Sequence, residues 1–310
     1  MLAIFLQTLP FFGLIGIGYR AGRTGFFPPE ATAYLTRFVF YFALSAMLFD
    51  FAATLTLGEI FDLRFVLAYL LGCGMVYALA TAVARLRGRG VAEAAVEAQT
   101  AVIGNTGFLG IPMFVLLLGE ASAGPLLMVL ATDFVVFSSL TVILVTAARQ
   151  GRVGLGTLRI VASGLARNPM IVSTCAGLAW SATGRGLWPP LAEFVAILGA
   201  AATPGALFAI GASLADKSAE RMSVAAWLAG CKLILHPAAV ALSALVLLPV
   251  ADPFAVTVMV SAAALPVAGN VFMLAQHYGV APLRVSAAIL VSTVLSIVTL
   301  PVAIALLTAR

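Results

Sequence analysis

Long apolar segments of similar length, separated by short polar or basic stretches, follow one another along this chain of 310 residues. An α-helix needs about 20 apolar residues to cross a bilayer, and these segments have that length. Hydropathy and the positions of Gly, Pro and charged residues predict ten membrane helices, at Leu2–Tyr19, Ala33–Ala53, Phe65–Ala84, Ala94–Leu118, Pro125–Ala147, Ala166–Ala182, Leu191–Leu214, Val224–Leu248, Phe254–Tyr278 and Val285–Leu307. The stretch Leu155–Ala166 is expected to lie along the membrane surface as a link between two halves, residues 1–150 and 151–310. The pattern therefore predicts an all-α membrane protein.

The composition excludes a water-soluble protein and several classes of function. Apolar residues make up 63% of the chain and charged residues 9%, and the mean hydropathy is +1.13. The 17 basic residues are scattered, so the net charge of +5 predicts no nucleic-acid-binding surface. Cys73, Cys175 and Cys231 fall in apolar segments and are expected to be buried thiols. With two histidines, no phosphate-binding loop and no hydrolase motif, we expect no metal, no cofactor and no enzyme.

The basic residues are better interpreted as signals of membrane orientation. Twelve lie in the odd-numbered connections: Arg20, Arg23, Arg85, Arg87, Arg89, Arg149, Arg152, Arg159, Arg167, Lys217, Arg221 and Arg284. Three lie on the opposite side of the predicted membrane, in the even-numbered connections or after the last helix: Arg64, Arg185 and Arg310. Because cytoplasmic loops carry the excess of Lys and Arg, we expect both termini outside the cytoplasm, in a bacterial inner membrane.

The two halves of the chain show signs of an internal repeat. At an offset of 159 positions, identical residues pair in corresponding helices: Pro10 with Pro169, Gly18 with Gly177, Leu48-Phe49 with Leu207-Phe208, and Gly110 with Gly269. Five helices per half is an odd number, so the second half must enter the membrane from the opposite face. The repeat is therefore predicted to be inverted, as in many secondary transporters.

Two of the predicted helices carry residues that interrupt a helix. The fourth contains three glycines between Gly104 and Gly110, followed by Pro112, and the ninth contains Pro266 and Gly269. We expect the fourth to open at Pro112 and Pro266 to free the carbonyl of Ala262, because proline removes a donor and clashes with the preceding turn.

Unpaired backbone groups survive at membrane depth only where they are buried in protein or line a cavity. Half-helix N-termini favour anions, so we expect an organic anion site formed by Asn105, Thr106, Gly107, Pro112, Pro266, Gly269 and Asn270. The alternative is that Gly and Pro merely permit close packing or a kink.

Three ionisable residues fall inside predicted helices. Lys232 and His236 are spaced i, i+4 on the eighth, so they share a face, and Asp133 lies in the fifth. Such residues usually face the protein interior or a cavity. Lys232 is a candidate countercharge to Asp133 or to the substrate, His236 and Asp133 are candidate proton carriers, and a purely structural role remains the alternative for all three.

Several runs of sequence resemble the auxin efflux carrier family, which includes bacterial malate and malonate permeases and the plant PIN-FORMED carriers. The resemblance spans nearly the whole chain, and its most specific parts surround Pro112 and Pro266. The runs are Leu35–Tyr41 through Leu48-Phe49, Gly104–Pro112, Ala206–Leu214, Lys232–Pro237, and Ala264–Pro266 through Asn270.

The resemblance implies ten helices in a 5+5 inverted repeat with crossed, broken helices four and nine, similar to bile-acid symporters and sodium/proton antiporters. Helices one, two, six and seven would form a scaffold that dimerises, and the other six a mobile transport domain. Asn105 and Pro112 would lie on one arm of the crossing, and Pro266 and Asn270 on the other. The third helix lacks the acidic residue of the plant carriers, which does not favour auxin as substrate.

The function expected is secondary transport of a small organic anion by an elevator-type mechanism. The anion would be a mono- or dicarboxylate such as malate or malonate, or an auxin-like acid. The alternatives are an organic-anion channel and a bile-acid-type sodium symporter on the same fold. Coupling to a proton, coupling to sodium and uniport all remain open, as do the carboxylate and the direction of transport.

Overall fold

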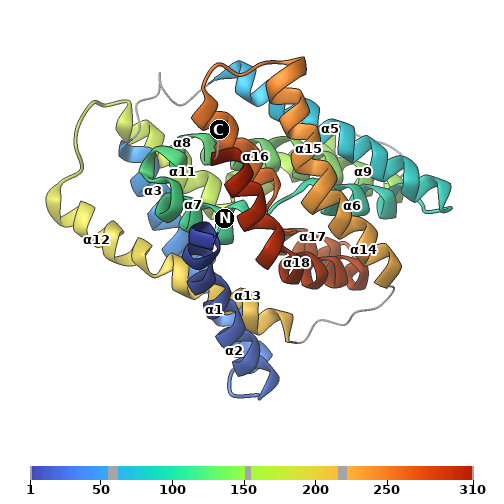
Figure 1. Ribbon diagram of the computed structural model, residues 1–310, viewed down its shortest axis with the longest axis horizontal. Coiled ribbons are helices and arrows are strands. Elements are labelled where there is room, and N and C mark those ends of the chain that lie inside the picture. Colours follow the sequence, from blue (N-terminus) through green and yellow to red (C-terminus); the bar gives the residue numbers. More distant parts are fainter. Residues whose placement is uncertain (1, 55–61, 151–154, 216–221, 309–310) are drawn as a thin grey trace.

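The computed structural model describes residues 2–54, 62–150, 155–215 and 222–308, and this part of the chain is helical apart from short connections and one isolated β-bridge (Figure 1). Four of the basic residues used to predict orientation, Arg152, Lys217, Arg221 and Arg310, lie outside the described residues. The described architecture confirms the predicted all-α class.

Within the described residues, six long helices are apolar enough to cross a membrane, and they correspond to the second, third, fifth, seventh, eighth and tenth predicted segments. Several contain a short π-helical turn (η) or a bend between α-helical pieces. The pieces are α2 Pro29–Phe38, η1 Val39–Ala43 and α3 Leu44–Thr54; α5 Leu63–Leu86; η3 Glu120–Ser122, a 3-10 turn, with α8 Ala123–Thr132, η4 Asp133–Ser138 and α9 Ser139–Gln150; α12 Pro189–Ala200 and α13 Ala202–Leu214; α14 Met222–Gly230, η5 Cys231–Leu235, α15 His236–Leu242 and η6 Ser243–Leu247; and α18 Pro282–Thr308. The first predicted segment forms α1, Leu2–Arg23.

The fourth and ninth predicted segments are interrupted. The fourth consists of α6 Val91–Val102, η2 Thr106–Gly110 and α7 Ile111–Leu118. The ninth consists of α16 Pro253–Ala263 and α17 Gly269–His277. Because neither is a continuous helix, each has backbone groups that need partners outside its own helix.

The sixth predicted segment is shorter than expected. The linking stretch forms α10, Leu155–Ala166, and a separate helix α11 covers Pro169–Ser181. Asn168 separates them, because its side-chain oxygen accepts from the backbone N–H of Met170 at 3.0 Å and so caps α11. Proline also disfavours helical geometry in the residue before it. The 13 residues of α11 span only about 20 Å.

Glycines allow two pairs of helices to approach closely, α1 with α13 and α3 with α11. A Cβ on Gly18 would lie 2.2 Å from the carbonyl oxygen of Phe208, and a Cβ on Gly177 would lie 2.5 Å from the carbonyl oxygen of Phe49. Gly177 stands 159 positions after Gly18, and Phe208 stands 159 positions after Phe49. The same contact therefore occurs twice, with the roles of the two halves exchanged.

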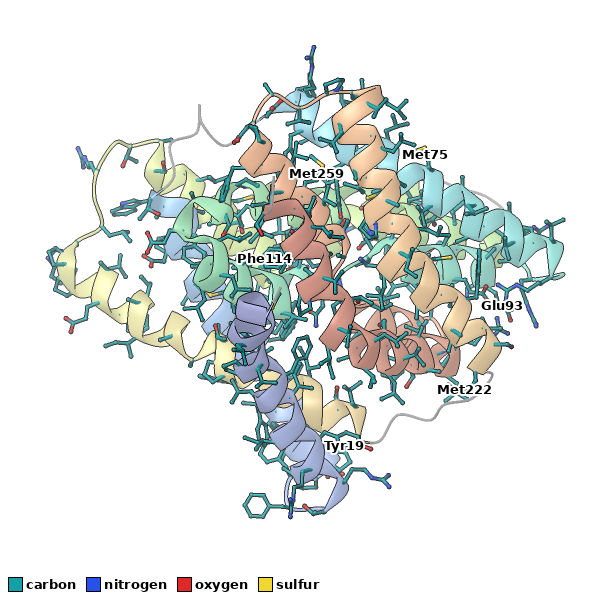
Figure 2. The ribbon with its side chains drawn as sticks, in the orientation of Figure 1. Tyr19, Met75, Glu93, Phe114, Met222 and Met259 are labelled. Atoms are coloured by element: carbon teal, nitrogen blue, oxygen red, sulfur yellow. The ribbon has the colours of Figure 1, made fainter. Side chains whose placement is uncertain are left out.

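The helices form two groups in Figure 1. α1, α2 and α13 project at the bottom with α12 on the left, whereas α5, α6, α14 and α15 lie on the right. Large apolar side chains remain exposed on many helices, while Phe114 and Met259 are fully buried (Figure 2). Tyr19 and Met222, at the edges of Figure 2, are 42% and 51% exposed. An apolar exterior of this kind suits hydrocarbon rather than water.

Candidate functional site

The two interrupted segments meet and complete each other's backbone hydrogen bonds. Gly104 forms an antiparallel bridge with Val267. The N–H of Asn105 donates to the carbonyl of Pro266 at 2.9 Å, and the N–H of Ala268 donates to the carbonyl of Ile103 at 3.1 Å. The chain thus leaves helical geometry in the interior without leaving these groups unpaired, which is the condition for a break at membrane depth. We call this junction, residues 103–105 with 266–268, the crossing.

The structure corrects the expected position of the first break. Pro112 lies in the first turn of α7, which continues from η2, and the break comes earlier, between Val102 and Thr106. The π-helical turn η2 directly precedes Pro112, so the helix accommodates the missing N–H at this junction and continues into α7. The prediction that Pro266 frees the carbonyl of Ala262 is also wrong, because the N–H of Leu265 donates to that carbonyl at 3.2 Å.

Side chains from two neighbouring helices hold the crossing in place. The hydroxyl oxygen of Ser292, on α18, accepts from the N–H of Val267 at 3.1 Å. The ammonium of Lys232, on η5, donates to the carbonyl of Ala263 and lies 3.1 Å from Nδ1 of His236. A Cβ on Gly104 would lie only 3.2 Å from Nζ of Lys232. The expected pair of Lys232 and His236 therefore lies directly behind the crossing.

Asp133 does not form the expected ion pair with Lys232 in the described structure. Its Oδ1 accepts from the hydroxyl of Tyr69 at 2.9 Å, and its Oδ2 is buried without a hydrogen-bond partner. Cys73, one turn from Tyr69 on α5, lies 3.0 Å from Nε2 of His236. Asp133, Lys232 and His236 thus belong to one buried polar region. Tyr69 and Cys73 of α5, which the sequence did not indicate, connect Asp133 to the other two.

A small cavity of about 20 Å³ lies against the crossing. Of the residues expected at the site, Asn105, Gly107, Gly269 and Asn270 line it, together with Asp133. Phe40 of η1 and Met170 of α11 face them from the other helix group. The volume is close to that of a single water molecule.

The remaining expected residues do not line this cavity. Thr106 is 1% exposed and its hydroxyl has no hydrogen-bond partner. Pro112 is buried within α7, and the carbonyl of Pro266 is used by the backbone of the crossing. Lys232 and His236 support the crossing from behind.

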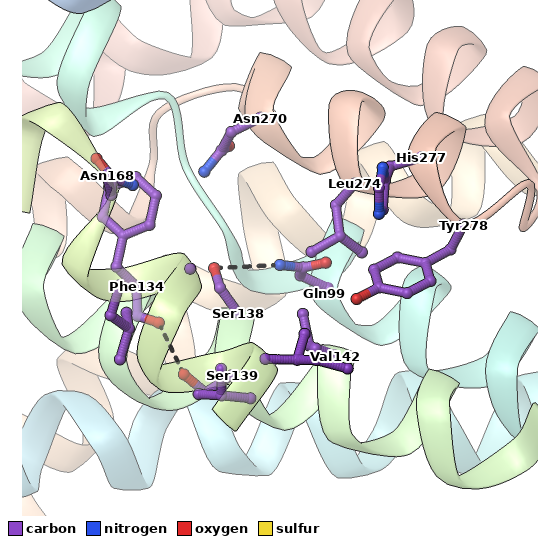
Figure 3. Close-up of a pocket in the computed structure, with 14 residues that line it drawn as sticks. Gln99, Phe134, Ser138, Ser139, Val142, Asn168, Asn270, Leu274, His277 and Tyr278 are labelled. Atoms are coloured by element: carbon purple, nitrogen blue, oxygen red, sulfur yellow. Dashed lines mark hydrogen bonds between the residues drawn. The ribbon is translucent and has the colours of Figure 1, made fainter. Parts of the chain in front are cut away.

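A larger cavity of about 330 Å³ adjoins the small one, because Asn270 and Phe134 line both. Figure 3 shows Asn168 and Asn270 toward one end and His277 and Tyr278 toward the other. α6, η4, α9 and α17 form one wall, and α10 with Asn168 forms the opposite wall. The volume is sufficient for a small organic acid.

Several polar residues of the larger cavity were missed by the sequence analysis: Gln99, Ser138, Ser139, Asn168, His277 and Tyr278. Gln99 is 1% exposed, and its amide nitrogen donates to the hydroxyl of Ser138 at 3.3 Å while its Oε1 has no partner. A polar Gln in an apolar segment was the available signal. Asn270 likewise keeps a buried Oδ1 without a partner. Unpaired buried amides beside a cavity are suited to binding a polar ligand.

One basic residue, Arg149, contacts the lining of the larger cavity through Tyr278. Arg149, at the end of α9, donates to the carbonyl of Tyr278 and lies 5.6 Å from the centre of its ring. Arg284 forms ion pairs at 2.9 Å with Glu93 and with the buried Glu97. Arg149 can attract anions to the cavity, whereas the neutral amides inside can bind them without a fixed countercharge.

Metal ligands do not gather anywhere in the described residues: no group of three or more His, Cys, Asp or Glu could hold an ion. Two cysteines, Cys73 and Cys231, are buried as expected, but Cys175 is exposed on α11. That prediction was wrong because an apolar segment facing lipid is as apolar as one facing the core.

Comparison with known proteins agrees with the apolar helices. The family described as "Membrane transport protein" matches residues 3–304. A protein of Rhizobium meliloti (strain 1021) named "Putative malonate transporter" is 35% identical over 298 residues, which cover 94% of this chain and 92% of that protein. Both matches extend over nearly the whole chain, including both interrupted segments. The chain is an integral membrane protein and a transporter rather than an enzyme, and it belongs to the auxin efflux carrier family of membrane transport proteins.

Proposed function

We propose that the protein is a secondary transporter of small carboxylates and that malonate is the first substrate to test. The observation that carries the proposal is the crossing, where a backbone-paired break lies beside unpaired buried amides and a cavity. Asn105, Gly269 and Asn270 would hold one carboxylate, helped by the first N–H groups of α17, which have no partner within their own helix. The name of the relative from Rhizobium meliloti supports malonate.

The architecture proposed is ten membrane helices in an inverted 5+5 repeat. Its support is the exchanged pair of glycine contacts, Gly18 on Phe208 and Gly177 on Phe49, which a pseudo-two-fold axis would produce. In this arrangement the scaffold contains α1, α2, α3, α11, α12 and α13, and the remaining membrane helices form the transport domain. The small cavity lies between these two groups, with Phe40 and Met170 on the scaffold side, and the larger cavity lies between the transport domain and the linking helix α10.

The transport domain would move against the scaffold, as in an elevator, and expose the crossing to one side of the membrane at a time. The larger cavity opens near Arg149, on the face that carries most of the basic residues. We therefore infer that this conformation is open toward the cytoplasm of a bacterial inner membrane, with both termini outside the cytoplasm. Exposed Phe194 and Ile197 on α12 suit a homodimer through the scaffold.

A carrier explains the cavities better than an anion channel on the same site. The space narrows from about 330 Å³ to about 20 Å³ at the crossing, as expected when access alternates. A bile-acid-type sodium symporter shares the proposed fold and differs in its coupling ion. Coupling by a proton or by sodium, and uniport, remain to be separated by transport under imposed gradients.

Uptake by purified protein in proteoliposomes tests the proposed function. Radiolabelled malonate, malate and an aromatic acid are offered with and without unlabelled substrate inside. A carrier predicts saturable uptake that internal substrate accelerates. Linear uptake without acceleration would indicate a channel, and no uptake or exchange of any acid would contradict transport of carboxylates.

A further inference from the structure

Asp133 is a negatively charged side chain at a site proposed for anions. It is 3% exposed and lines the small cavity together with Asn105, Gly269 and Asn270. An anion held by those groups would lie in the same small space as the carboxyl of Asp133. Two like charges at such distances in a poorly hydrated interior repel strongly. The cavity therefore cannot hold both an ionised Asp133 and the substrate at low cost.

Neighbouring groups do not neutralise the carboxyl directly. Tyr69 donates one hydrogen bond to Oδ1 and also contacts Cys73 on the same helix. Lys232 lies within electrostatic range of Asp133, but its ammonium is turned toward a backbone carbonyl and His236. Among the described residues, these are the titratable groups of α5, η5 and α15 that face Asp133. Its Oδ2 remains buried without a partner.

We propose that Asp133 carries the proton that accompanies the anion. A proton from the larger cavity binds Oδ2, the neutral carboxyl then admits the substrate to the crossing, and proton and anion cross together. Asn270 and Phe134 line both cavities, so only these two side chains need to move for water in the larger cavity to reach Asp133. The inference rests on the proposed function, because it assumes an anion at the crossing.

A proton fits this cavity better than sodium. Within the described residues, the lining groups offer two oxygens without a hydrogen-bond partner, Oδ2 of Asp133 and Oδ1 of Asn270. Hard cations such as Ca²⁺ take about six or more oxygen ligands, and these two side-chain oxygens alone do not supply them. A proton needs only the carboxylate oxygen that lacks a partner.

The test compares Asp133→Asn with Asp50→Asn in proteoliposomes that contain a pH-sensitive dye. Asp50 is an acidic residue of α3 that does not line either cavity. For wild type and Asp50→Asn, malonate should acidify the interior and accumulate under an inward proton gradient, with uptake about tenfold faster at about pH 6 than at about pH 8. For Asp133→Asn, the acidification and accumulation should be lost, and the ratio between the two pH values should fall to about twofold or less, while labelled malonate still exchanges.

The outcomes separate this inference from the proposed function. Protonation of malonate itself affects all variants equally, so the comparison between variants isolates the carboxyl. Wild-type uptake without proton movement, uptake driven by a sodium gradient, or accumulation by Asp133→Asn equal to that by Asp50→Asn would overturn the inference and leave carboxylate transport intact. If Asp133→Asn does not fold, the dye measurement on wild type alone decides whether a proton moves. Failure of wild type to take up or exchange any carboxylate would contradict the proposed function instead.

Discussion

Replacing Ser292 by alanine removes one atom from the support of the crossing. Its hydroxyl is fully buried and accepts from the N–H of Val267, which is 1% exposed. Without that acceptor the N–H is left unpaired, and an unsatisfied buried donor costs about 1–3 kcal/mol. If this whole cost destabilises the ordered crossing that binds malonate, the apparent affinity for malonate falls about 5- to 150-fold.

Ser296→Ala is the matched control, because Ser296 is equally buried one turn along α18. Its hydroxyl donates to the carbonyl of Thr293 at 2.8 Å, and no backbone donor at the crossing depends on it. Thermal unfolding in detergent and the concentration dependence of malonate uptake are measured for both variants. We expect Ser292→Ala to be the less stable variant and to require more malonate. Equal stability and equal uptake in the two variants would refute the reasoning that Ser292 maintains the crossing.

Two glycine substitutions test the packing around the site. In Gly211→Ala the new Cβ would lie 1.9 Å from the backbone oxygen of Ile15, so we expect the free energy of unfolding to fall by about 1–3 kcal/mol. Gly16→Ala, whose Cβ would meet nothing within 4 Å, should be neutral or stabilising. Equal stability of the two variants in thermal unfolding would contradict the close contact of α1 and α13. In Gly107→Ala the Cβ would meet the end of the Met170 side chain at 2.5 Å, so uptake should fall about tenfold and recover when Met170 is also changed to alanine. Wild-type uptake by the single variant would show that this contact does not limit transport.

Much of the architecture could be predicted because apolar length is a strong local signal. The six long helices follow the predicted segments closely, since about 20 apolar residues leave few alternatives to a membrane helix. The breaks were predicted in the correct helices but the first was misplaced. Pro112 draws attention in the sequence, yet the helix continues through it from η2 into α7. Gly104 permits the close approach that the break requires.

The partners of the buried charges could not be predicted from sequence. Tyr69 lies 64 positions from Asp133 within the first half, and Cys73 lies 163 positions from His236 in the second half, so the contacts depend on how distant helices pack together. The larger cavity draws its residues from separate elements, so the sequence does not show that Gln99 lines a cavity with them. Spacing within one helix predicted that Lys232 and His236 share a face, because that relation is local.

Direct measurement of malonate binding to Asn270→Ala tests the central claim, that the crossing binds the anion. Asn270 lines both cavities and has a buried oxygen without a partner, whereas Gln276, on the same helix, is exposed and lines neither. A hydrogen bond to a charged group contributes about 1.5–3 kcal/mol, so malonate should bind Asn270→Ala about 10- to 150-fold more weakly than wild type, and Gln276→Ala like wild type. Wild-type affinity in folded Asn270→Ala would contradict the account.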